Sequence, residues 1–263
     1  MEFAPCGGHH QREQIPWKVL LAHLQRSFSF HRYVEQMMQP AELLRVPGVP
    51  ETAVAPEVLA QLPTEVPPAP WRCRGSAVLW LSRGGAAASA ALPDGIRTRG
   101  LFAAGGFIRY TDTPVGSYDE VMGIVGFRDG FSLLGNVAFM AVDSLTSLAG
   151  GRTNWAMPKT VASFAGSPGD AMQASGDGWQ VDATVRPFGP RLPLRMSMVA
   201  AQQWPDGQIR RALMRLRSSA RLAVVDARVE SDRELNGWLR PGKHLGLVTS
   251  NLEFTLSPAH PEA

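Results

Sequence analysis

One lysine of this chain stands in a segment that could make its side-chain amine reactive. Only three of the 26 basic residues are lysines, and the others are arginines, which keep their proton at ordinary pH. Lys159 is the only charged residue between Arg152 and Asp170. Among the basic residue types, lysine is the one that can supply a neutral and nucleophilic amine. Its isolation on an apolar stretch makes Lys159 the first candidate for chemistry.

The burial of Lys159 would decide whether its amine can react. If the segment is extended, Met157, Lys159 and Val161 point to the same face, and an ammonium on an apolar face loses hydration, which lowers its pKa. Burial shifts of up to ~3–5 units are known, enough to leave a neutral amine that could attack a ketone. In the alternative, the aliphatic stem packs on the apolar face and the ammonium reaches water. The residues alone leave both arrangements open.

A tyrosine and a glutamate upstream form a second candidate pair. In residues 113–121, Tyr118 and Glu120 are two positions apart and face the same side of a strand, with Asp119 on the opposite side. A phenol beside a carboxylate could orient a substrate or move a proton. The same spacing is equally compatible with an edge strand whose polar groups bond to neighbouring backbone.

The segments that must position these residues have the pattern of β-strands. From Trp71 onward, short apolar runs alternate with glycine and proline, which is typical of strands joined by turns. We predict strands at 77–81, 107–110, 121–127, 136–142, 179–185, 194–200, 222–229 and 247–256, and a helix near 144–149. The arginine-rich stretch 210–221 is predicted to be a strand with one apolar and one polar face, not a nucleic-acid surface. The predicted fold class is β-rich α+β, with a large and mostly antiparallel barrel or sandwich.

The N-terminal part of the chain is organised differently. Apolar residues between Trp17 and Phe28 recur at helical spacing, and a second short helix is predicted at 33–38. Seven prolines between positions 46 and 70 indicate a connector, with one helical turn at 57–61. We therefore expect a tail and helical appendage at 1–45, a proline-rich linker at 46–70 and one β domain at 71–263. The appendage could cap the mouth of a barrel or join subunits.

Composition and motifs narrow the class of protein. The formal net charge of +3 is mild, and none of the six histidines stands at metal-ligand spacing with cysteines or carboxylates. No His-Glu-x-x-His, Gly-x-Ser-x-Gly elbow or P-loop occurs. The two cysteines form no disulfide framework, no apolar run is long enough for a membrane span, and the N-terminus lacks the order of a secretion signal. We expect a cytoplasmic protein that needs no metal or organic cofactor and has no nucleic-acid or membrane partner.

The spacing of the two candidate segments resembles the acetoacetate decarboxylase family. The motif Gly-x-Tyr-x-Glu that ends at Glu120 is similar to the family's glycine–tyrosine–glutamate segment. Gly-Arg beginning at Gly151, followed by Pro-Lys ending at Lys159, is similar to its Gly-Arg-Glu and Pro-Lys-Lys segments. The likeness covers about residues 68–258 and leaves out the first 65 residues.

The resemblance implies a β-cone or barrel, a homo-oligomer, and a lysine that forms a Schiff base with a 2-keto or 3-keto acid. Acetoacetate decarboxylase is a known example of an enzyme with an activated lysine. Carried over by position, Lys159 is the Schiff-base lysine, Glu120 the pocket glutamate and Arg152 the arginine of the Gly-Arg segment. Lys159 and Glu120 are thus the predicted catalytic residues, and Arg152, Tyr118 and Trp155 the predicted substrate-binding residues.

Three positions depart from the family pattern. Thr160 stands where the family has a second lysine, and Thr153 where it has a glutamate after Gly-Arg. Residues 103–106, where the decarboxylases carry an acidic residue, contain none. Because neighbours on a strand face opposite sides, loss of the second lysine is compatible with an amine that burial alone activates. Loss of the acidic residue suggests a different substrate, or a different reaction on the same iminium.

The predicted function is that of a carbon–carbon lyase, decarboxylase-like, which acts on a small-molecule oxo-acid through an imine on Lys159. The iminium would accept the electrons freed when a 3-oxo acid loses carbon dioxide. Two alternatives stay open: an aldolase-dehydratase on pyruvate-like substrates through the same lysine, and a non-catalytic member that binds a small acid. Glu120 would shuttle protons or hold the substrate, and Arg152 could anchor a carboxylate.

Overall fold

The computed structural model describes residues 40–261. Contacts along the chain separate a first unit, Met1–Met37, from a second unit, Met38–Ala263, and the fold described here is that of the second unit. The helices predicted at 17–28 and 33–38 lie outside the described residues.

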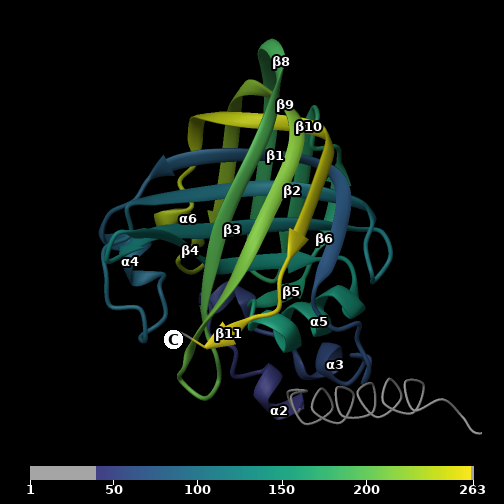
Figure 1. Ribbon diagram of the computed structural model, residues 1–263, viewed down its shortest axis with the longest axis vertical. Helices are drawn as coiled ribbons and strands as arrows, with labels where there is room; N and C mark the ends of the chain where they lie inside the picture. The colour runs from purple at the N-terminus through teal and green to yellow at the C-terminus, as the bar shows by residue number, and fades with distance from the viewer. Residues whose placement is uncertain (1–39, 262–263) are drawn as a thin grey trace, which may run out of the picture. The chain divides into compact units, whose positions relative to one another are not determined.

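Strands make up most of this unit, and its helices are few and mostly short (Figure 1). The strands are β1 (Trp71–Arg83), β2 (Phe102–Asp112), β3 (Tyr118–Asp129), β4 (Ser132–Val142), β5 (Lys159–Val161), β6 (Ser163–Gly166), β7 (Ala171–Gly176), β8 (Trp179–Gln203), β9 (Ile209–Ser231), β10 (Gly242–Leu256) and β11 (His260–Pro261). The helical elements are α2 (Pro40–Leu43), η1 (Pro50–Thr52), α3 (Pro56–Leu59), α4 (Ala86–Ala90), α5 (Leu145–Trp155) and α6 (Leu235–Trp238). Every predicted strand falls within an observed strand, and the two predicted at 179–185 and 194–200 are parts of the single strand β8. The β-rich fold class is confirmed.

The strands of the described residues form one sheet of eleven strands, with the order β11-β9-β10-β1-β2-β3-β4-β8-β7-β6 and with β5 paired to β4. Neighbours are antiparallel, except that β4 is parallel to β5 and to β8. An additional pairing of β8 with β9 closes the path from β9 through β10, β1, β2, β3 and β4 to β8 into a ring of seven strands. The ring is not a regular barrel, because β4 and β8 pair only at Leu134–Val199 and Gly135–Ala200. A regular barrel or cone stays a prediction.

Strands β1–β4 are buried on both faces. In β2, Phe107 belongs to a first core and the next residue, Ile108, to a second core. In β3, Val121 lies in the first core and Tyr118 in the second. Because successive side chains of a strand point to opposite faces, the two cores lie on opposite sides of these strands. This double burial explains why β3 and β4 are apolar along most of their length.

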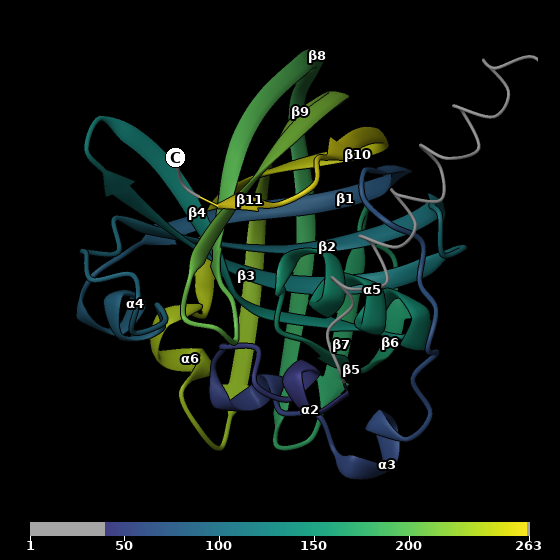
Figure 2. The same cartoon turned by 60° about the horizontal axis from the view of Figure 1, so that its bottom comes forward.

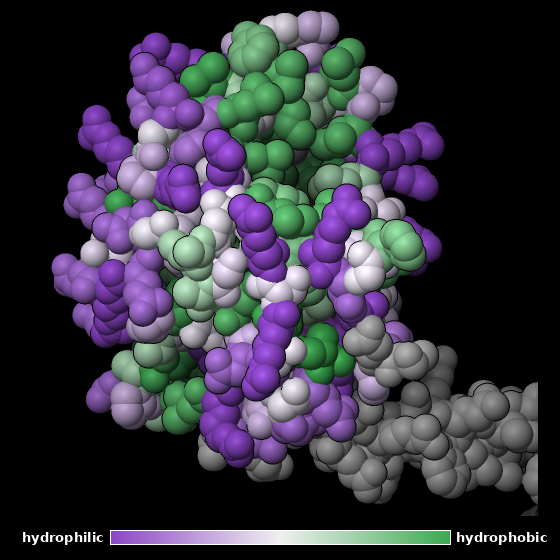
Figure 3. Space-filling model, turned by 90° about the vertical axis from the view of Figure 1, so that its left-hand side faces the viewer, coloured by the Kyte–Doolittle hydropathy of each residue, from purple (hydrophilic) through white to green (hydrophobic). Residues whose placement is uncertain are grey.

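The arginine-rich stretch lies in β9. Ala212, Leu216 and Ala220 are buried there, whereas Arg215 and Arg217 are exposed, so the predicted strand with one apolar and one polar face is confirmed. Figure 3 shows a group of hydrophobic side chains near the top of one face of the molecule, with hydrophilic side chains on both sides of it and below it. The surface therefore carries apolar as well as charged regions.

The proline-rich residues 46–70 belong to the same compact unit as the strands. Val49 and Val66 are buried, and the N–H of Val49 donates to the carbonyl of Ala138 in β4 at 3.0 Å. The predicted helical turn at 57–61 overlaps α3, and Figure 2 shows α2 and α3 on the same side of the sheet as α5. Among residues 40–261, no helix combines the length and the hydropathy needed to cross a membrane.

Candidate active site

A helix–turn–strand unit positions Lys159. The side chain of Ser144 caps the start of α5 by accepting a hydrogen bond from the N–H of Ser147 at 3.2 Å. At the end of α5, Ala156 adopts a left-handed conformation with a φ of 50° and turns the chain. Lys159 then begins β5 and pairs with Met140 of β4 in parallel register. The unit thus returns the lysine to the sheet, next to the helix that precedes it.

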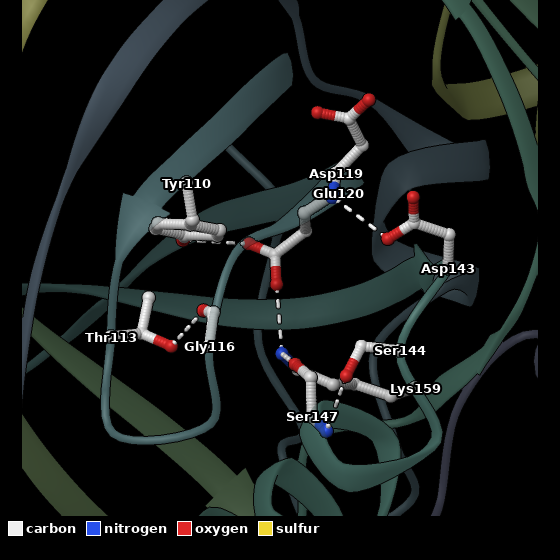
Figure 4. A network of polar contacts seen from close by, with 9 residues as sticks. All are labelled: Tyr110, Thr113, Gly116, Asp119, Glu120, Asp143, Ser144, Ser147 and Lys159. Carbon is white, nitrogen blue, oxygen red and sulfur yellow. Dashed lines mark hydrogen bonds and ion pairs between the residues drawn. The ribbon is translucent and has the colours of Figure 1, made fainter.

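The amine of Lys159 is enclosed by polar groups beside the second core. The residue is 3% exposed, and its Nζ lies 2.8 Å from Oε2 of Glu120 and 2.9 Å from Oγ of Ser147 (Figure 4). The ring of Tyr118 also faces the amine, with 5.2 Å between Nζ and the ring centroid. The alternative in which the ammonium reaches water is therefore not the arrangement found.

The lysine side chain runs along α5 where Gly151 leaves room for it. A Cβ atom at Gly151 would lie 2.5 Å from both Cδ and Cε of Lys159, closer than carbon atoms can approach. Ser147 is one turn earlier on the same helix face, so the stem passes Gly151 and the amine ends at Ser147. The glycine of the Gly-Arg motif therefore has a steric reason to be glycine.

Glu120 is hydrogen-bonded at both carboxylate oxygens. Oε2 faces Lys159, and the hydroxyl of Tyr110 donates to Oε1 at 3.1 Å, so the two partners approach the carboxylate from different sides (Figure 4). Tyr110 pairs with Tyr118 across β2 and β3, with 4.5 Å between the ring centroids. Burial, and then the negative charge of Glu120, raises the pKa of both phenols well above its usual value. Both tyrosines are therefore neutral at ordinary pH.

The opposite face of β3 carries an ion pair. Asp119 accepts hydrogen bonds from Nε and Nη2 of Arg109 at 2.8 and 2.7 Å, and its own N–H donates to Asp143 at 2.8 Å. The prediction that Tyr118 and Glu120 share one face, with Asp119 on the other, agrees with these contacts. They tie β3 to β2 and to the end of β4, and so hold the strand that carries Glu120.

Arg152 lies against the main chain of the site. Its buried guanidinium donates to the carbonyls of Leu43, Thr52 and Lys159, with 2.7 Å from Nε to the lysine carbonyl. Burial lowers the pKa of Arg152 to about 10. The arginine therefore contacts Lys159 through its main chain and not through its amine.

Trp155 is directed toward other partners than the lysine. Its indole N–H donates to the carbonyl of Ser257 at 2.7 Å, and its ring packs edge-on against Trp71 with centroids 5.0 Å apart. The structure thus brings together the lysine, glutamate and tyrosine of the two motifs. Of the other two predicted residues, Arg152 lies against the main-chain carbonyl of Lys159, and Trp155 belongs to the second core.

Three residues around the ion pair were not selected from the sequence: Tyr110, Ser147 and Cys73. Burial, and then the charge of Glu120, raises the pKa of the Cys73 thiol to about 12, so the thiol is neutral. Ser147 could have been found by its spacing of four residues from the glycine of the Gly-Arg motif. Tyr110 and Cys73 become neighbours only through the pairing of β1, β2 and β3.

The site joins a primary amine, a carboxylate and neutral hydroxyl groups in a buried setting. Glu120 can take a proton from the amine and return it, while Ser147 holds Nζ in place. Among residues 40–261, no three or more His, Cys, Asp or Glu side chains are grouped so that they could hold a metal ion. The chemistry that these residues can supply is nucleophilic attack by an amine with an acid–base partner.

Solved structures with a similar fold include three related enzymes. The acetoacetate decarboxylase of Legionella pneumophila is 17% identical, with a TM-score of 0.54 over 75% of this chain and 88% of that one. An acetoacetate decarboxylase-like enzyme of Sphingomonas wittichii is 18% identical, with a TM-score of 0.52 over 75% and 94%. The enduracididine biosynthesis enzyme MppR is 18% identical, with a TM-score of 0.50 over 75% and 89%. At these identities the likeness concerns the fold.

No curated protein matches the sequence significantly. The family model described as acetoacetate decarboxylase matches residues 53–235, which is well over half of the chain and includes both motifs and every residue in contact with the amine of Lys159. The chain therefore belongs to the acetoacetate decarboxylase family.

Proposed function

We propose that the chain is a carbon–carbon lyase that forms an imine between Nζ of Lys159 and the ketone of a small oxo-acid. The observation that carries this proposal is the burial of the amine 2.8 Å from a carboxylate. An amine attacks a carbonyl only after it has lost its extra proton, and Oε2 of Glu120 is an acceptor within hydrogen-bond reach. Membership of the family supports the same class of catalysis.

The reaction would begin with transfer of a proton from the ammonium of Lys159 to Glu120. The neutral Nζ attacks the ketone carbon, and the ketone oxygen takes up one proton from Nζ, which gives a carbinolamine. The proton held by Glu120 then joins the hydroxyl group, the carbon–oxygen bond breaks and water leaves, and an iminium with one hydrogen on Nζ remains. In a 3-oxo acid, the electron pair of the bond to the carboxylate flows into the iminium as carbon dioxide departs, and an enamine remains. Protonation of the enamine carbon and hydrolysis of the iminium then release the ketone and free the amine.

The charges around the amine favour decarboxylation over a reaction that retains the carboxylate. After burial, the negative charge of Glu120 raises the pKa of Tyr110, of Tyr118 and of the Cys73 thiol, so it is the anionic charge that acts on the groups around the amine. In the part of the chain that the structure describes, the cation bonded to Glu120 is Lys159 itself, and Arg152 is bonded to main-chain carbonyls. A carboxylate that persists would stay close to Glu120, whereas loss of carbon dioxide removes the repulsion between them.

An aldolase-dehydratase is the second candidate. MppR has been solved with pyruvate and with the condensation product of pyruvate and imidazole 4-carboxaldehyde. Residues 103–106, where the decarboxylases carry an acidic residue, contain none in this chain, which supports a different reaction on the same iminium. In this route the iminium formed from pyruvate loses a proton to give an enamine, which attacks an aldehyde.

Reduction with borohydride tests the imine. The protein is incubated with acetoacetate or with pyruvate, reduced and digested, and we expect a mass increase on the peptide that contains Lys159, because hydride converts the iminium into a stable amine. Lys159→Met should abolish the adduct, and Lys243→Met, at an exposed position, should retain it. Absence of an adduct with both acids, in protein that circular dichroism shows to be folded, would contradict the proposal and favour a non-catalytic member that binds a small acid.

The products separate the two routes. Release of carbon dioxide from a 3-oxo acid identifies a decarboxylase, and formation of an enone from pyruvate and an aldehyde identifies an aldolase-dehydratase.

A further inference from the structure

Residues 43–53 form a segment, here called the strap, that lies against the main chain around Lys159. Most of the strap precedes residues 53–235, which the family model matches, and it contains no residue of the candidate active site. Its contacts nevertheless reach the lysine through three residues: Arg152, Pro158 and Thr160.

Arg152 joins the strap to Lys159. Nη1 donates to the carbonyl of Leu43, Nη2 donates to that of Thr52 at 2.7 Å, and Nε donates to that of Lys159 at 2.7 Å. The guanidinium is planar and the residue is 2% exposed, so three bonds in different directions fix its orientation. The beginning and the end of the strap are thereby held to the main chain of the lysine.

The strap also contacts the two strands beside the lysine. The hydroxyl of Thr160, the residue after Lys159, donates to the carbonyl of Ala53 at 2.9 Å. The N–H of Val49 donates to the carbonyl of Ala138 in β4, the strand that pairs with β5. The strap therefore follows β4 and β5 together.

Gly48 brings the strap against the residue before the lysine. A Cβ atom at Gly48 would lie 2.4 Å from Cβ of Pro158 and 2.5 Å from Oγ1 of Thr52. No side chain fits there unless the strap or Pro158 moves.

The other side of the strap is braced by α6. Oε1 of Glu51 accepts hydrogen bonds from the hydroxyl of Ser231 and from the N–H groups of Glu234 and Leu235, the last two at 2.8 Å. Glu51 is 4% exposed, so these bonds hold it inside the protein. Because these bonds hold the strap on this side, a group added at Gly48 would displace Pro158, the residue before Lys159, more readily than the strap.

We propose that the strap is a positioning element for Lys159, acting through Arg152 and Pro158. For its effect on turnover this inference rests on the proposed imine chemistry. Displacement of a reacting group by ~1 Å can cost ~10²-fold in rate, so a small shift of the main chain at Pro158 is enough to be measured.

Gly48→Ala tests the strap with one methyl group. We expect kcat for oxo-acid turnover to fall by about tenfold or more while KM changes by less than about twofold, because the amine is misplaced and the substrate surroundings are kept. Gly169→Ala is the matched control, since a Cβ atom there meets no heavy atom within 4 Å. It should leave both constants unchanged.

A second measurement reports on Lys159 without any substrate. Trace acetylation with acetic anhydride across a range of pH, read by mass spectrometry, compares the reactivity of Lys159 with that of exposed Lys243. We expect the pH dependence for Lys159 to shift in Gly48→Ala and in Arg152→Lys, which keeps the charge but loses the planar fork. Gly169→Ala should match the unmodified chain.

The outcomes separate this inference from the proposed function. If the unmodified chain turns over no oxo-acid and the acetylation profile still shifts in Gly48→Ala, the proposed function fails and the strap stands. If Gly48→Ala lowers the melting temperature but leaves kcat and the acetylation profile of Lys159 unchanged, the strap contributes only stability and the inference is wrong.

Discussion

The lysine and the glutamate of the site depend on each other for their burial. Both side chains are almost completely enclosed, at 4% and 3% exposure, and each is the other's opposite charge. Removing one partner of a buried ion pair typically costs about 3–5 kcal/mol, because the remaining charge is left without compensation. Replacing both partners by uncharged groups of similar size is often close to neutral.

At this scale we predict strong coupling between substitutions of the two residues. Lys159→Met alone should lower the free energy of unfolding by about 3–5 kcal/mol, and Lys159→Met with Glu120→Gln should recover most of that loss. Urea unfolding at neutral pH measures the free energy for Lys159→Met, for Glu120→Gln and for the double variant, with Lys243→Met as the control. A double variant whose loss equals the sum of the two single losses would show that the pair is not coupled.

At the scale of elements, α5 and β5 together position the amine of Lys159. The helix supplies Ser147 as a partner and Gly151 as a gap, and the turn at Ala156 brings β5 back alongside. Because the lysine stem fills the space where a side chain at Gly151 would be, the helix and the lysine cannot be changed independently.

Gly151→Ala should therefore impair the reaction although alanine favours the helix by ~1 kcal/mol over glycine. We expect the rate of borohydride-trapped adduct formation to fall by about 10²-fold as the added Cβ displaces Cδ and Cε of Lys159. Gly237→Ala in α6, where a Cβ atom meets nothing within 4 Å, serves as the control. Equal trapping rates in the two variants would show that the lysine stem can take another path.

At the scale of the whole described unit, Glu51 ties the strap to the last residue of β9 and to the start of α6, which lie 180 to 184 positions further along the chain. Burial by itself would raise the pKa of this carboxyl, but hydrogen bonds from Ser231, Leu235 and Glu234 outweigh burial and lower the pKa below its ordinary value of 4.5. The ionised form therefore favours the folded state. Its contribution is present above the pKa of the unfolded chain and is lost as the pH falls through the lower pKa of the folded chain.

Glu51→Gln should accordingly destabilise the folded protein at neutral pH but not in acid. We expect the difference in unfolding free energy between the unmodified chain and Glu51→Gln to be largest above about pH 5 and to shrink below about pH 4. Urea titrations at several pH values test this, with Glu57→Gln at an exposed position as the control. A difference that stays constant between pH 7 and pH 3 would contradict the role of the ionised carboxylate.

The sequence predicts elements well where one pattern dominates. The long strands were found because their apolar runs are bounded by glycine and proline, whereas β7 (Ala171–Gly176) was missed because its small residues give little signal. Lys159, Glu120 and Tyr118 follow from motifs within single segments. Tyr110 does not, because it reaches Glu120 only through the register of β2 with β3.

The direction of a side chain is harder to predict than its place in a motif. Arg152 was expected to anchor a substrate carboxylate, and that role stays a prediction, since its three hydrogen bonds go to carbonyls in the strap and in β5. Two of those acceptors lie 100 and 109 positions away in the chain. No local pattern around the Gly-Arg motif could have indicated them.

Because β3 is buried on both faces, the register of this strand decides whether Glu120 and Lys159 meet. A slip of one residue would exchange its faces, so that Val121 would meet the amine and Glu120 would enter the first core. Two charges would then be buried apart, at a cost of several kcal/mol for each. The salt bridge at the centre of the site therefore also discriminates against a shifted sheet, and a chain that folds correctly has assembled its reactive pair by the same event.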